Sequence, residues 1–134
     1  MNNPSLMSHV SIGVNDFKRA VTFYDAVLAT IGAGRAFEHE GAVAYGRTFP
    51  EFWVHEPLDE GPPGVGNGTH FAFVAPDRAS VVAFYEAALE AGATPDGAPG
   101  PRPQYGAPYY GCFVRDLDGH KIEAVFWDAT LAEG

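Results

Sequence analysis

Apolar and polar residues alternate near the start of the chain and then change to a helical spacing. Residues 9–14 place valine or isoleucine at every second position, which predicts a strand. From residue 17 to residue 31 apolar side chains recur at intervals of three and four, which predicts an amphipathic helix. Asp16 suits the N-cap of this helix, and Gly32 suits its end.

The rest of the chain carries further strand and helix signals. Strands are predicted at 35–39, 42–47 and 51–55, before a Gly- and Pro-rich linker at 56–68. After the linker the pattern predicts a strand at 69–75, a helix from Asp77 to Gly92, and two strands at 109–115 and 121–127 joined by a turn at 116–119. Residues 95–108 are rich in Pro and Gly, so we expect an irregular surface loop that acts as a lid.

The first strand and helix are repeated. Residues 9–28 recur as residues 70–89 at a constant offset of 61. The two copies share, without a gap, the pairs His9/His70, Asp16/Asp77, Val21/Val82, Phe23/Phe84, Tyr24/Tyr85, Ala26/Ala87 and Leu28/Leu89. The chain therefore predicts two βαβββ units in series with pseudo-twofold symmetry, and such folds bind ligands between their halves.

Composition narrows the range of partners. A length of 134 residues fits one domain, and a formal net charge of −9 without a Lys/Arg stripe disfavours nucleic acid and anionic membranes. No apolar run reaches the ~20 residues of a membrane span. The start of the chain lacks the pattern of a secretory signal, and Cys112 is the single cysteine, so we expect a cytoplasmic protein.

Three ionisable residues share one kind of position. His9, His70 and Glu123 each alternate with apolar residues that face a helix, so all three should project from the uncovered faces of the sheets. Two imidazoles and one carboxylate form a good site for Zn(II), Ni(II), Co(II), Fe(II) or Mn(II) if these faces curve around one cavity. The alternative is that the histidines are ordinary hydrogen-bonded residues at the starts of strands.

The pattern resembles the vicinal oxygen chelate superfamily, which includes glyoxalase I, extradiol dioxygenases and bleomycin-resistance proteins. The matching motifs are His9, the run Gly68-Thr69-His70, and the run from Asp118 to Glu123. The resemblance implies an α+β fold in which two tandem βαβββ modules form a cupped mixed sheet. It places one domain over residues 1–134, with module 1 at about 8–55, the linker at 56–68 and module 2 at about 69–128.

The resemblance also implies roles for single residues. His9, His70 and Glu123 match three metal ligands of the family, whereas Trp53 occupies the fourth ligand position and cannot coordinate. Glu51 and His55 flank Trp53 on the same strand face.

The candidate substrate pocket comprises Trp53, His55, Tyr109, Tyr110 and Arg47, and one of the two adjacent tyrosines should face the cavity. His39, His55 and His120 are expected to be solvated, and Cys112 to be a buried apolar residue.

Three functions remain open on this evidence. The first is a glyoxalase-I-like lyase or isomerase in which a divalent ion chelates neighbouring oxygens of a small substrate, with Glu123 or Glu51 moving a proton. The second is an Fe or Mn extradiol-type dioxygenase that acts on a catechol-like compound. The third is a metal-free, drug-sequestering binding protein. A homodimer is expected in each case.

Overall fold

The structure, a computed structural model, describes residues 6–57, 64–66 and 68–131. Most of the predicted linker, residues 58–63 and 67, lies outside the described residues. Module 1 consists of β1 (Val10–Gly13), α1 (Phe17–Ala29), β2 (Gly34–His39), β3 (Ala42–Gly46) and β4 (Phe52–His55). Module 2 consists of β5 (His70–Val74), α2 (Arg78–Glu90), β6 (Thr94–Pro101), the 3-10 turn η1 (Pro103–Tyr105), β7 (Tyr109–Arg115), β8 (Lys121–Trp127) and the 3-10 turn η2 (Ala129–Leu131).

Both helices begin where the repeat predicts. The carboxylate of Asp16 accepts a hydrogen bond from the backbone N–H of Arg19, and that of Asp77 accepts one from Ser80. These bonds satisfy backbone donors that the first turn of a helix leaves unpaired. Gly32 and Gly92 follow the two helices with positive φ angles of 82° and 106°, so the predicted helix boundaries are confirmed.

Each module forms its own four-stranded mixed sheet. The strand orders are β1-β4-β3-β2 and β5-β8-β7-β6, so β1 and β5 are edge strands at equivalent positions. In each sheet the edge strand runs parallel to its neighbour and the other pairs are antiparallel. The α+β architecture of two tandem βαβββ modules is therefore confirmed.

The prediction of an irregular loop at 95–108 is wrong for its first half. Residues 94–101 form β6, which pairs with β7 through two register shifts, between Pro95 and Gly97 and between Gly97 and Gly100. Proline cannot donate to a ladder, but an edge strand leaves one side unpaired, and irregular pairing accommodates the missing donors. The segment from 102 to 108 lies outside the strands and contains the turn η1.

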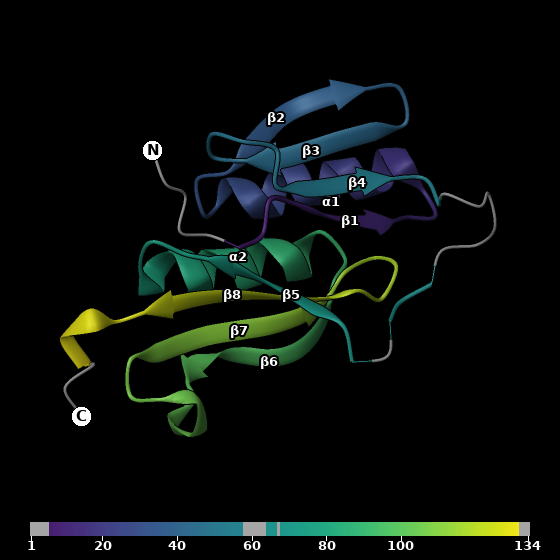
Figure 1. The fold of residues 1–134 in the computed structure, drawn as a ribbon. Coiled ribbons are helices and arrows are strands. Elements are labelled where there is room, and N and C mark those ends of the chain that lie inside the picture. Colours follow the sequence, from purple (N-terminus) through teal and green to yellow (C-terminus); the bar gives the residue numbers. More distant parts are fainter. Residues whose placement is uncertain (1–5, 58–63, 67, 132–134) are drawn as a thin grey trace.

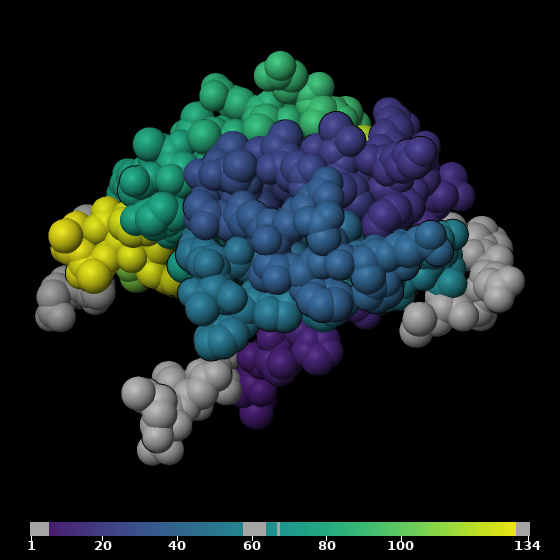
Figure 2. All heavy atoms as spheres, turned by 90° about the horizontal axis from the view of Figure 1, so that it is seen from above, coloured from purple at the N-terminus to yellow at the C-terminus, as the bar shows by residue number. Residues whose placement is uncertain are grey.

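The two modules pack through their helix-covered sides. Module 1 lies above module 2 in Figure 1, α1 contacts α2, and one continuous core contains buried residues of both. Seen from above in Figure 2, the blue residues of module 1 abut the green residues of module 2. Phe52 joins the halves, because its ring lies 5.9 Å from that of Phe71 and 5.0 Å from that of Phe73.

Polar contacts fix the same interface. The Tyr24 hydroxyl of module 1 donates to the buried carboxylate of Asp116 in module 2. The Nε2 atom of His120 lies 2.9 Å from the carbonyl oxygen of Gly13, to which it donates. His120 is therefore buried (7% exposed), and the expectation that it is solvated is wrong, because module 1 covers the turn on which it sits.

No helix in the described ranges combines the length and the hydropathy that a membrane crossing requires.

Candidate functional site

His70 and Glu123 meet on the face of module 2 that the helix does not cover. His70 opens β5 and Glu123 lies on the neighbouring strand β8, where it pairs with Ala72. The Nε2 atom of His70 is 3.2 Å from Oε1 of Glu123. The His70 side chain is 45% exposed, whereas the Glu123 side chain is only 8% exposed. The pair thus joins an accessible imidazole to a buried carboxylate.

The second oxygen of Glu123 is held by Tyr109. The Tyr109 hydroxyl donates to Oε2 at 2.5 Å, and both side chains are buried. Burial and the Glu123 carboxylate together raise the pKa of Tyr109 well above the usual range of tyrosine. The phenol therefore stays protonated and remains a hydrogen-bond donor at neutral pH.

Tyr110 takes the opposite direction from Tyr109. Its ring lies under the guanidinium of Arg78, 4.8 Å from ring centroid to Cζ. Of the two adjacent tyrosines, Tyr109 is therefore the one that lies on the face of Glu123. Tyr110 belongs to the other face of the sheet, since neighbouring strand residues alternate.

Positive groups surround Phe113 next to this pair. Phe113 pairs with Glu123 across the β7–β8 hairpin. The Lys121 ammonium lies 4.8 Å from its ring centroid, and the Arg102 guanidinium lies 5.8 Å away. Sequence reasoning offers Arg102 as a candidate for binding an anionic group but misses Phe113 and Lys121, although counting back from the Asp118-Gly119 turn places Phe113 opposite Glu123. The site therefore combines a carboxylate, an imidazole and two cations in a chain of negative net charge.

Module 1 presents a corresponding face. Trp53 pairs with Ser11 as Glu123 pairs with Ala72, so Trp53 stands at the position of Glu123 in the repeat, as predicted. The ring of His9 lies 6.3 Å from that of Trp53, and Phe37 packs 5.5 Å away on the other side. His55 is half-buried, and its Nδ1 lies 2.5 Å from the carbonyl oxygen of Glu56. This face thus presents the exposed imidazole of His9 beside an aromatic wall of Trp53 and Phe37.

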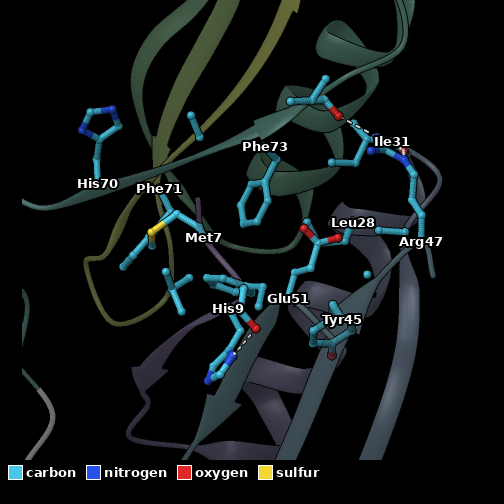
Figure 3. A pocket seen from close by; sticks show the side chains of 17 residues that line it. Met7, His9, Leu28, Ile31, Tyr45, Arg47, Glu51, His70, Phe71 and Phe73 are labelled. Carbon is cyan, nitrogen blue, oxygen red and sulfur yellow. Dashed lines mark hydrogen bonds between the residues drawn. The ribbon is translucent and has the colours of Figure 1, made fainter. Parts of the chain in front are cut away.

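The faces of the two modules are separate within one chain. Figure 3 shows His9 and His70 at opposite sides of a pocket and pointing away from each other. Within the described residues no group of three or more His, Cys, Asp or Glu side chains is close enough to hold a metal ion. One chain therefore brings His70 to Glu123 but does not bring His9 to either.

The pocket between the modules has a volume of about 370 Å³, and Glu51 and Arg47 line it. Arg47 crosses the interface, because its Nη2 donates to the carbonyl oxygens of Ile31 at 2.7 Å and Val74 at 2.6 Å. Glu51 points into the pocket, towards Phe73 and Leu28 (Figure 3). Both residues thus lie between the modules, in a pocket that His70 also lines and Glu123 does not.

Comparison with known proteins gives the family. The model of the Glyoxalase/Bleomycin resistance protein/Dioxygenase superfamily matches residues 6–124. The chain belongs to this superfamily. No curated protein sequence matches the chain at a significant level.

Solved structures agree with this assignment. A glyoxalase/bleomycin resistance protein from Albidiferax ferrireducens is 34% identical, with a TM-score of 0.82 over 91% of this chain and 98% of that one. A lactoylglutathione lyase from Agrobacterium tumefaciens is 18% identical, with a TM-score of 0.63 over 96% and 98%. A glyoxalase I variant from Zea mays is 20% identical, with a TM-score of 0.67 over 97% of this chain and 50% of that one. The last two share the fold and carry no argument about the reaction.

Proposed function

We propose that this protein is a metal-dependent lyase or isomerase of the glyoxalase type and that it acts as a homodimer. The observation that carries the proposal is the His70–Glu123 pair, whose facing atoms are 3.2 Å apart. Zn–N and Zn–O bonds are each about 2.0–2.2 Å long, so two atoms at this spacing fit two ligands of one ion. The partly exposed imidazole leaves the pair open to solvent on one side.

His9 is the proposed third ligand, and it comes from a second copy of the chain. It occupies the position of His70 in the repeat but points away from His70 within its own chain. The edge strands β1 and β5 each have one neighbour in their sheets, and Val74 on β5 is 59% exposed. Pairing β1 of one copy with β5 of another would cover these edges and bring His9 to the His70–Glu123 pair.

The residues around Glu123 suit proton transfer next to a carbonyl group. A divalent ion held by His9, His70 and Glu123 would supply Lewis acidity towards two neighbouring oxygens of the substrate. Glu123 is the proposed base once its Oε1, which faces His70 and the open side, is displaced from the metal; Oε2 stays with the Tyr109 hydroxyl. It takes a proton from the carbon beside the carbonyl and returns it to the former carbonyl carbon, while the hydroxyl proton passes from one substrate oxygen to the other. Arg102 favours a substrate with an anionic group, whereas the Lys121 ammonium is already paired with Asp96 at 3.5 Å.

A second candidate is an Fe- or Mn-dependent dioxygenase of the extradiol type. Trp53 at the position of a fourth carboxylate leaves three ligands, a set that suits Fe(II) with open positions for oxygen and substrate. Trp53 and Phe37 add an aromatic wall against which a catechol ring would pack.

The test is the metal content of protein purified without a histidine tag or chelator. We expect about one divalent ion per chain, with loss of the ion in His70→Ala and retention in His39→Ala. His39 is a suitable control because it is exposed on β2 and its Nδ1 is hydrogen-bonded to the backbone carbonyl oxygen of Glu40.

Turnover assays then separate the two enzyme candidates. Zinc, nickel or cobalt with turnover of a 2-oxoaldehyde hemithioacetal supports the lyase, whereas iron or manganese with oxygen uptake on catechols supports the dioxygenase. A wild-type protein that refuses every added metal contradicts both candidates and leaves a metal-free binding protein.

A further inference from the structure

We propose that Tyr109 is a positioning residue for Glu123 and that Tyr105, in the turn η1, holds Tyr109 in place. The link to metal binding rests on the proposed function. The contact between Tyr109 and Glu123 does not rest on the proposed function, because the chain makes it without metal or partner.

Tyr109 reaches Glu123 across a gap that only glycine provides. Tyr109, Gly111 and Phe113 point to the same face of β7, and Glu123 lies opposite Phe113 on β8. A Cβ atom on Gly111 would stand 2.5 Å from the Tyr109 hydroxyl oxygen and 2.8 Å from its Cζ. The hydroxyl end of the phenol therefore lies over Gly111, and this position brings the hydroxyl to Oε2 of Glu123.

Two aromatic side chains hold the Tyr109 ring in this position. Tyr105 meets it edge to face, with centroids 5.0 Å apart and an interplanar angle of 74°. Trp127 does the same from β8 at 5.4 Å and 80°. Edge-to-face pairs of this kind are each worth about 0.5–1.5 kcal/mol beyond their buried area. The ring is 4% exposed, so it has little room to rotate away.

The hydrogen bond determines which oxygen of Glu123 stays available. With Oε2 bound to the tyrosine hydroxyl, Oε1 is the atom that faces His70. Outer hydrogen bonds of this kind orient a ligand and typically account for about 10–100-fold in metal affinity. Tyr109 thus presents Glu123 as a ligand through one defined oxygen.

Tyr105 connects this contact to the segment 102–108. It is 53% exposed, and Gly106 follows it with a φ of 118°. A displacement of η1 removes one side of the aromatic support of Tyr109 without breaking a strand. The segment 102–108 therefore supports the position of the Glu123 carboxylate through Tyr105 and Tyr109.

The experiment compares Tyr109→Phe with Tyr110→Phe. Both substitutions remove one hydroxyl from neighbouring positions of β7, but only the Tyr109 hydroxyl touches Glu123. By calorimetric titration with Zn(II) or Ni(II), we expect Tyr109→Phe to bind about 10–100-fold more weakly than wild type and Tyr110→Phe to bind like wild type. Tyr105→Leu should show a smaller loss in the same direction.

A second readout needs no metal. In NMR spectra of metal-free protein labelled at the glutamate carboxyl carbons, the chemical shift of the Glu123 carboxyl should change in Tyr109→Phe and stay the same in Tyr110→Phe. A wild-type protein that binds no metal overturns the proposed function, while the resonance still decides the role of Tyr109. The inference is wrong if the two variants give the same affinity and the same resonance.

Discussion

Removal of the Tyr24 hydroxyl should destabilise the protein through the junction of the two modules. Asp116 is 5% exposed, and its carboxylate accepts from the Tyr24 hydroxyl at Oδ2 and from the N–H groups of Asp118 and His120 at Oδ1. Tyr24→Phe keeps the aromatic ring and its packing against Phe52 at 5.2 Å. It leaves Oδ2 of a buried carboxylate without its partner, since no other hydrogen bond to this atom exists in the described part of the chain.

The expected size of the effect follows from that contact. A hydrogen bond to a charged group is worth about 1.5–3 kcal/mol, so we expect a loss of about 2 kcal/mol in the free energy of unfolding. An unfolding entropy of about 2.1 cal/mol/K per residue then implies that Tm falls by about 7 °C for this length of chain. Urea unfolding followed by circular dichroism measures the first quantity, and a thermal scan measures the second.

The internal repeat supplies the control. Tyr85 is the counterpart of Tyr24 in the second copy, and its hydroxyl has no hydrogen-bond partner among the described residues. Tyr85→Phe should change the stability by less than about 0.5 kcal/mol. If the two variants lose the same stability, or neither loses any, the Tyr24–Asp116 contact does not join the modules as described.

Three further predictions concern other parts of the core. Gly111→Ala places a Cβ atom against the Tyr109 ring and 2.9 Å from a backbone oxygen of β8, so urea unfolding should show a loss of about 1–3 kcal/mol; a neutral result contradicts the packing. Burial raises the pKa of Tyr24 and Tyr45 above 10.0, so their contribution to stability is constant below about pH 10 and falls above it. Above pH 10 the unfolded chain loses protons that the folded chain retains, so the free energy of unfolding falls by about 1.4 kcal/mol per pH unit for each tyrosine. A urea midpoint that stays constant between pH 9.5 and about 11.5 contradicts this prediction. Burial raises the pKa of Cys112 to about 11, so the thiol should react with a disulfide reagent only after unfolding, and rapid labelling of native protein refutes its burial.

Features of the fold that depend on local sequence were predictable. Asp16 and Asp77 cap their helices as expected, because a cap needs only a side-chain oxygen and the N–H groups that follow it. The equivalence of Trp53 and Glu123 followed from the repeat and the alternation along strands, and the register confirms it. These inferences rest on spacing along the chain, which the sequence contains directly.

Features that depend on contacts between distant segments were not predictable in the same way. His120 beside a tight turn was expected to be solvated, but module 1 buries it. The proline-rich stretch at 94–101 pairs as an edge strand because β7 offers it a partner. The direction of His9 relative to His70 depends on how the modules pack, and no local pattern encodes that packing.

The most direct test of a metal site shared between two copies is a complementation experiment. His9→Ala and His70→Ala chains, each carrying a different affinity tag without histidines, are refolded together, and the mixed dimer is isolated. A shared site predicts that each variant by itself binds no metal. The mixed dimer regains one intact site, His9 of the second variant with His70 of the first, and holds about one ion per two chains. A mixed dimer as empty as its parents, beside a wild-type protein that holds metal, contradicts the shared site.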